Sequence, residues 1–120
     1  MNNKILGNQG EALAANYLIQ HGYAILAQNY RIRSAELDLV VKDGNTVAFV
    51  EVKTRRNMHF GSGAEAVNYR KQKKIIQAAQ YFLQRWNLEE CPCRFDVIEI
   101  YKDTNQLYRI HHLKNAFESH

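Results

Sequence analysis

Acidic residues and a lysine stand on segments of the chain that are otherwise apolar. In the run Phe49 to Lys53, Glu51 and Lys53 are separated by one valine, and because strand side chains alternate between faces, both point to one side of a strand. Asp38 lies in a second apolar run. Paired carboxylates beside a lysine suit a divalent-metal site that hydrolyses phosphodiesters. An ordinary Glu51–Lys53 ion pair on a solvated sheet face is the competing interpretation of the spacing alone.

The position of Asp38 relative to Glu51 depends on the register of a hairpin. Asp-Gly between two apolar runs is a hairpin signal. With Asp43 and Gly44 as the central turn residues, counting places Asp38 opposite Phe49 and makes it a diagonal neighbour of Glu51 on the same face. Their Cβ atoms would then be ~6 to 8 Å apart, close enough to share one cation. A three-residue loop without a compensating bulge would put Asp38 on the other face.

Glu11 is a further candidate for this site. At helical spacing it lies beside Gly7, Ala14 and Leu18, a small and apolar face suited to close packing on a sheet. A carboxylate there could be a third metal ligand or could support the ligands. A helix-surface glutamate at the margin of the apolar stripe is the alternative.

Positive charge is concentrated in the middle of the chain. The basic residues there are Arg55, Arg56, Arg70, Lys71, Lys73 and Lys74. Four of them occupy the first turns of a predicted helix, where the macrodipole disfavours cations. We interpret the six as contacts to nucleic-acid phosphates, beside a glycine-rich loop over residues 54–66. A solvated basic helix face is the alternative.

Periodicity predicts the elements that position these residues. A first helix is expected from about Lys4 to His21, with Gly22 as its C′ residue. A second, long helix follows residue 66, and its buried stripe is predicted to be Ile75, Ala79, Phe82, Leu83 and Trp86. Five strands are predicted over Tyr23–Tyr30, Leu37–Val41, Val47–Lys53, Arg94–Tyr101 and Gln106–His112, before a short tail at Leu113–Phe117. The predicted order is α-β-β-β-α-β-β.

Composition limits the class of protein. A chain of 120 residues with 46% hydrophobic content can bury one modest core, so we expect a single α/β domain over residues 1–120. Without a run of about 18 apolar residues or a signal-peptide core, it is expected to be cytoplasmic with no membrane partner. Cys91 and Cys93 fit neither a disulfide framework nor a zinc site and are expected to be reduced. The net charge of +4 permits a polyanionic partner.

The ordered motifs resemble those of the small bacterial YraN family, also called UPF0102, over nearly the whole chain. The matching segments are Gly7-x-x-Gly10-Glu11-x-x-Ala14, Gly22-Tyr23, Asn29-Tyr30-Arg31, Glu36-Leu37-Asp38-Leu39-Val40, Phe49-Val50-Glu51-Val52-Lys53-x-Arg55, Lys71-Gln72 and Arg94-Phe95-Asp96-Val97. Asp38 with the Glu51-Val52-Lys53 tripeptide also resembles the motif of the PD-(D/E)xK nuclease superfamily.

The resemblance implies a restriction-endonuclease-like core, a mixed five-stranded sheet flanked by helices, similar to archaeal four-way-junction resolvases. It also implies that Glu11, Asp38 and Glu51 surround Mg²⁺ or Mn²⁺, with Lys53 as the catalytic lysine. Two departures are visible: where the family usually reads Gly-Glu-Ile-Asp, this chain has Ala35-Glu36-Leu37-Asp38, and the region before it, Ile32-Arg33-Ser34, also lacks that glycine. Alanine in place of glycine could alter the backbone approach at the site, while the ligand types are intact.

We therefore expect a metal-dependent endonuclease that hydrolyses DNA phosphodiesters, on branched or single-stranded recombination or repair intermediates. The alternative is a catalytically silent nuclease-fold protein that binds DNA or acts as an adaptor. A domain of this size offers little surface for enclosing DNA, so a homodimer or a partner protein would complete the binding surface.

Overall fold

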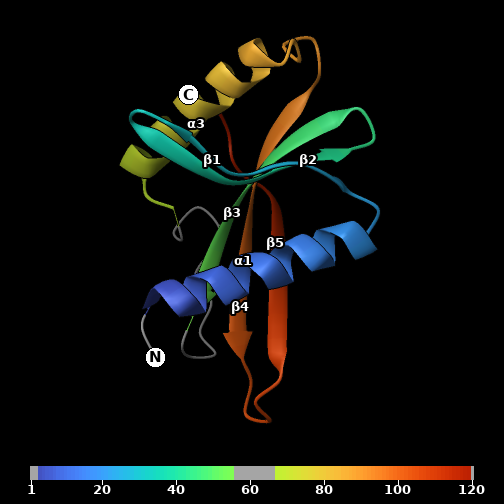
Figure 1. Ribbon diagram of the computed structural model, residues 1–120, viewed down its shortest axis with the longest axis vertical. Helices are drawn as coiled ribbons and strands as arrows, with labels where there is room; N and C mark the ends of the chain where they lie inside the picture. The colour runs from blue at the N-terminus through green and yellow to red at the C-terminus, as the bar shows by residue number, and fades with distance from the viewer. Residues whose placement is uncertain (1–2, 56–66, 120) are drawn as a thin grey trace.

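A computed structural model of the protein describes residues 3–55 and 67–119, which form one mixed sheet with a helix on each face (Figure 1). The elements are α1 (Asn3–Gln20), β1 (Ala24–Ile32), β2 (Ala35–Asp43), β3 (Thr46–Arg55), α3 (Tyr69–Arg85), β4 (Cys93–Lys102) and β5 (Tyr108–Phe117). The predicted α/β class and the order α-β-β-β-α-β-β are confirmed. Neither of these helices is long and apolar enough to cross a membrane. Cys91 and Cys93 are free thiols.

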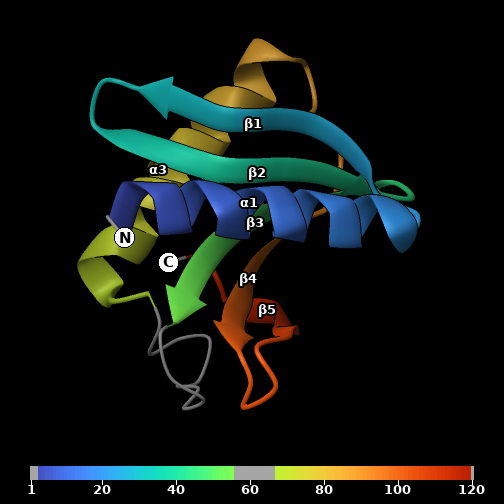
Figure 2. The ribbon, with the colours of Figure 1, turned by 60° about the horizontal axis from the view of Figure 1, so that its bottom comes forward.

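The strands lie side by side in sequence order, from β1 at one edge to β5 at the other. All neighbours are antiparallel except β3 and β4, which are parallel. A parallel pair needs a crossover connection, and α3 lies within it. As Figure 2 shows, α1 lies in front of the sheet and α3 behind it. Because both faces of β3 are covered, its run from Val47 to Val50 is continuously buried.

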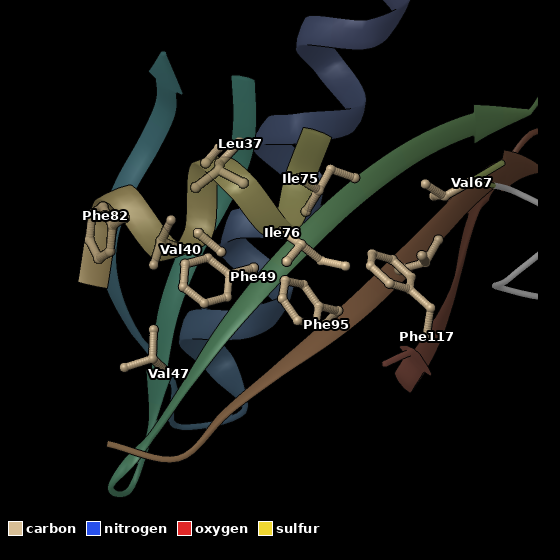
Figure 3. Close-up of a cluster of buried hydrophobic side chains, with 13 residues drawn as sticks. Leu37, Val40, Val47, Phe49, Val67, Ile75, Ile76, Phe82, Phe95 and Phe117 are labelled. Atoms are coloured by element: carbon tan, nitrogen blue, oxygen red, sulfur yellow. The ribbon is translucent and has the colours of Figure 1, made fainter. Parts of the chain in front are cut away.

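Aromatic rings fill the core between the sheet and α3. Phe49 on β3 stacks on Phe95 of β4 with ring centroids 5.5 Å apart, and Phe95 stacks on Phe117 of β5 at 5.0 Å (Figure 3). Phe82 of α3 meets Phe49 edge-on at 6.1 Å. Such pairs contribute about 0.5–1.5 kcal/mol beyond their area burial, so these rings fix α3 on the sheet.

The start of α3 is set by a capping residue. The Asn68 side chain accepts a hydrogen bond of 2.9 Å from the backbone N–H of Lys71, as an N-cap asparagine does. The helix ends at Trp86, after which Asn87 takes a left-handed φ of 55°. Trp86 is therefore the C-cap residue. Its predicted place in the buried stripe is wrong, because it lies beyond the last turn and is 53% exposed.

The tail predicted at Leu113–Phe117 is also wrong, since these residues continue β5. The strand continues past an irregularity in its pairing with β4, between Phe95 and Val97. There Asn115 takes a φ of 53° and donates its backbone N–H to Asp96 at 3.1 Å. The hydrogen bond gives the Asn115 N–H a partner at the irregularity, and Phe117 beyond it packs in the core.

The β2–β3 hairpin turns one residue later than predicted. Asp43 pairs with Thr46, so Gly44 and Asn45, rather than Asp43 and Gly44, are the central turn residues. Gly44 takes a φ of 61°, which two-residue hairpin turns require at their first central position. The pairing therefore differs from the predicted one by two residues. Because strand faces alternate with a period of two, every side chain keeps its predicted face.

Helix α1 packs closely on the other face of the sheet. Gly22, at a φ of 87°, follows its C-terminal end as predicted. The helix residues Ala14 and Leu18 are fully buried in the core beneath it. Gly10 is buried too, and a Cβ atom there would collide with the Thr54 hydroxyl of β3. The small side of α1 thus sets how near the helix lies to β3.

We expect Gly10→Ala to lower the free energy of unfolding by roughly 1–2 kcal/mol, because overpacking outweighs the better helix propensity of alanine. In a Thr54→Ala background the obstructing hydroxyl is gone, and the same substitution should be neutral or stabilise by up to ~1 kcal/mol. Urea unfolding of the four proteins of this cycle measures both effects. Equal effects of Gly10→Ala in the two backgrounds would contradict the proposed contact.

Candidate active site

The candidate site forms where β2 separates from β3. Their regular pairing ends at Leu39 opposite Val50, and one further step in the same register sets Asp38 opposite Glu51. Here side-chain carboxylates accept the hydrogen bonds that backbone carbonyls accept elsewhere between the two strands. The backbone N–H of Val52 donates to Asp38 Oδ2 at 2.9 Å, and that of Asp38 donates to Glu51 Oε2 at 3.4 Å. Each carboxylate is thus held by the backbone of the opposite strand. Hairpin counting predicted this pair on one face, although as diagonal rather than opposed residues.

Burial makes two negative charges unfavourable at this position. Glu51 is 2% exposed, and its burial, followed by repulsion from Asp38, raises its pKa to about 8. Burial also raises the pKa of Asp38, while its hydrogen bond from Val52 and the charge of Lys71 act in the opposite direction. Near neutral pH the pair therefore retains a proton unless a cation compensates the charge.

Two lysines face these carboxylates. Lys53 follows Glu51 by two residues on β3, and burial together with the adjacent Lys71 lowers its pKa. Lys71 reaches in from the first turn of α3 and places its Nζ 3.8 Å from Glu51 Oε1. Sequence analysis treated Lys71 only as a phosphate contact on a basic helix face. Its place beside Glu51 follows from the crossover of α3 and from the cap at Asn68, which fixes where the helix begins.

Glu11 lies near Asp38 but belongs to a neighbouring group. With its side-chain amide nitrogen facing the carboxylates, Asn29 donates to Glu11 Oε2 at 3.1 Å and to Glu36 Oε1 at 3.2 Å. Burial, and then the charges of Asp38 and Glu36, raise the pKa of Glu11. Glu36 also forms an ion pair with Arg31 at 3.3 Å. Glu11 therefore lies near Asp38 as part of a second acidic group, in which Asn29 holds Glu11 and Glu36 together.

The residues of the site fit a hard divalent cation held by few protein ligands. Across residues 3–55 and 67–119, no group of three or more His, Cys, Asp or Glu side chains gathers closely enough to hold a metal by itself. Glu51 and the half-buried Asp38 nevertheless supply two carboxylates whose mutual repulsion a cation would relieve. Mg²⁺ is commonly held by one or two carboxylates and completes its shell with water and phosphate oxygens. The donor set suits that mode of binding.

Glu99 is a buried acidic residue that sequence analysis missed. It is fully buried on β4, in register with Lys53, and its Oε2 lies 3.2 Å from Nε of Arg55. Its Oε1 has no hydrogen-bond partner within the described part of the chain. A charged residue inside the apolar run from Val97 to Ile100 was the available signal. The ion pair holds Arg55 on the same side of β3 as Lys53, as strand alternation requires.

The other described residues that were predicted to contact phosphates do not join the site. Arg70, Lys73 and Lys74 are exposed on α3, and the Lys73 ammonium lies 5.3 Å from the centre of the Tyr69 ring. Thr54 and Arg55, predicted as the start of the glycine-rich loop, instead end β3, and Arg56 and the rest of that loop lie outside the described residues. The structure therefore brings together Asp38, Glu51, Lys53 and Lys71, with Arg55 and Glu11 at the margins.

Comparison with known proteins gives a single family over most of the chain. Residues 10–100 match the model described as uncharacterised protein family UPF0102. A UPF0102 protein of Caldicellulosiruptor saccharolyticus is 45% identical, with 98% of this chain and 100% of the relative covered. Relatives from Clostridioides difficile and Chlorobium chlorochromatii are 46% and 48% identical, covering 98% and 93% of this chain and 100% and 90% of their own lengths. The matched residues include the whole candidate site.

In the absence of divalent cations, we expect the protein to lose stability as the pH rises from about 4.5 to 8. Folded Glu51 keeps its proton up to a pKa of about 8, whereas the unfolded chain releases it near 4.5. The folded state thus binds more protons in this window, so raising the pH favours unfolding. Glu51→Gln should flatten this slope and stabilise the protein at pH 8 by roughly 2–4 kcal/mol.

Urea unfolding in EDTA at pH 5 and pH 8 measures this difference. Glu90→Gln, which changes an exposed carboxylate outside the site, is the matched control and should keep the wild-type slope. A Glu51→Gln protein with the same pH dependence as wild type would contradict the assigned burial of charge.

Proposed function

The chain belongs to the UPF0102 family, and we propose that it is a metal-dependent endonuclease whose Asp38 and Glu51 bind Mg²⁺ or Mn²⁺ at a DNA phosphodiester. The observation that carries the proposal is the pair of carboxylates across the β2–β3 separation, Glu51 buried and Asp38 half-buried, faced by two lysines. A purely structural ion pair needs one acid and one base, and it gains nothing from a second buried carboxylate. Two carboxylates beside two lysines instead suit a site that binds a cation and a phosphate together.

When bound, the metal would supply Lewis-acid stabilisation of the phosphate and of the leaving oxygen. Asp38 and Glu51 hold their carboxylates in fixed positions through the backbone bonds across the two strands. The lowered pKa of Lys53 makes its Nζ able to accept a proton from, or orient, the attacking water. Lys71 Nζ, beside Lys53 and 3.8 Å from Glu51 Oε1, donates to a non-bridging phosphate oxygen and stabilises its developing charge.

The exposed basic residues in the first turns of α3 offer DNA phosphates a further surface outside the site. Arg70, Lys73 and Lys74 follow directly around Lys71 in the first turns of the helix. Within the described residues, no ion pair engages any of the three, so their charges are available to phosphates. This contribution to binding is independent of sequence and decreases with salt.

We expect wild-type protein with Mg²⁺ or Mn²⁺ to cut at least one of a panel of flap, junction, duplex and single-stranded DNAs. Asp38→Asn, Lys53→Met and Lys71→Met should each lower the single-turnover rate by about 100-fold or more, because each removes a group that acts on the reacting phosphate. Lys114→Met, an exposed lysine on β5 outside the site, is the matched control and should retain the wild-type rate. EDTA should abolish cleavage. Rates that do not differ between wild type and Asp38→Asn on every substrate would rule out the enzyme.

A DNA-binding or adaptor protein without catalysis is the second candidate. It is favoured by the lack, within residues 3–55 and 67–119, of a cluster of three metal-binding side chains. Salt-dependent DNA binding that is unchanged by EDTA and by Lys53→Ala, without cleavage of any substrate in the panel, would support this function over the nuclease.

A further inference from the structure

A hollow lies on the surface between the end of the β1–β2 hairpin and α3. It has a volume of about 320 Å³ and is lined by Arg31, Ile32, Arg33, Ser34 and Tyr81. Pockets for small ligands span roughly 300–1,000 Å³, so the hollow can hold one flat ring with its substituents. None of its lining residues belongs to the carboxylate and lysine site described above.

The lining combines positive charge with an aromatic face. Arg33 is exposed, and no carboxylate pairs with it among the described residues. Arg31 forms an ion pair with Glu36, but its side chain is 76% exposed and its other nitrogens remain accessible. Tyr81 projects from the C-terminal half of α3 and is 53% exposed. Guanidinium groups beside an exposed ring match the two parts of a nucleotide, its phosphate and its base.

The two sides of the hollow are held together. Ser34 Oγ donates to Gln77 Oε1 of α3 at 3.4 Å, which ties the hairpin end to the helix. Gln77 lies four residues before Tyr81, so both side chains lie on one side of α3. Ile32 and Ala35 pack against the buried core under the helix. The spacing between the arginines and the ring is therefore set by packed elements.

The hollow lies close to the candidate active site along β2. Ala35, next to Ser34, precedes Asp38 by three residues, or ~10 Å of extended strand. Glu36 lies between them, paired with Arg31 on one side and acting electrostatically on Asp38 on the other. At ~3.4 Å per nucleotide of a stacked strand, ~10 Å corresponds to about three nucleotides.

We propose that this hollow binds an unpaired nucleotide of the DNA strand that enters the active site, with the base stacked on Tyr81 and the phosphate held by Arg33 and Arg31. A base inside a duplex is covered on both faces by its neighbours and cannot stack on a side chain. The hollow therefore selects single-stranded or branched DNA over continuous duplex. The distance of about three nucleotides from the scissile phosphate rests on the proposed nuclease function, whereas the binding itself does not.

Fluorescence anisotropy with the full-length chain in EDTA tests the binding without cleavage. The probes are a labelled single-stranded oligonucleotide, the same strand with one abasic site moved along it, and the matching duplex. Tyr81→Ala should weaken single-strand binding by about 10-fold to 100-fold, and Tyr81→Phe, which keeps the ring, should restore it to within about twofold. Duplex binding should change by less than about twofold in both variants.

Arg33→Ala should weaken single-strand binding and reduce the salt slope by about one, while Arg109→Ala, an exposed arginine on β5, should leave both unchanged. One abasic position should reproduce the loss seen with Tyr81→Ala, and the two losses should not add. Equal effects of Tyr81→Ala on single strand and duplex, no effect on either, or no measurable DNA binding would overturn the inference. Base-dependent binding without any Asp38-dependent cleavage would retain the hollow and remove the nuclease function.

Discussion

The central constraint in this structure is the close approach of two carboxylates, one buried and one half-buried, where β2 separates from β3. Asp38 and Glu51 take over backbone N–H groups that the regular ladder leaves without partners, so neither side chain can turn outward without cost. The surrounding sequence supplies compensation: Lys53 lies on the same face of β3, and the Asn68 cap starts α3 where Lys71 can reach Glu51. Local folding signals thus bring together two carboxylates whose charge a retained proton, the two lysines or a bound cation would compensate.

Strand alternation was sufficient to predict the core of the candidate site. Glu51 and Lys53 lie on one face because they are two residues apart, whatever the fold around them. Asp38 remained on that face although the turn was placed one residue too early, because moving the turn from Asp43-Gly44 to Gly44-Asn45 shifts the pairing by two residues. The shift changed only the spacing, from a diagonal to an opposed pair. An odd shift would have removed Asp38 from the site.

The features that sequence analysis missed depend on contacts between distant segments. Lys71 joins the site because α3 crosses over between parallel strands, and Glu99 lies beside Lys53 because β4 pairs with β3 in that register. Neither neighbour follows from local periodicity. The extension of β5 likewise depends on the hydrogen bond from Asn115 to Asp96, which lies on another strand. The helices and strands could be predicted from sequence patterns, whereas the positions of Lys71 and Glu99 beside Glu51 and Lys53 depend on the tertiary structure.

Charged residues on β2 and α3 lie next to the candidate site and lead from it to the surrounding surface. Glu36 acts electrostatically on Asp38 and pairs with Arg31 toward the hairpin end, and further basic residues surround Lys71 in the first turns of α3. The central claim is that Asp38 and Glu51 bind one cation. Crystals soaked in Mn²⁺ and measured at its absorption edge test this most directly. The claim predicts an anomalous peak about 2.0–2.3 Å from oxygens of both carboxylates. At saturating Mn²⁺, the absence of a peak at this pair, or a peak bound only by other groups, would contradict it.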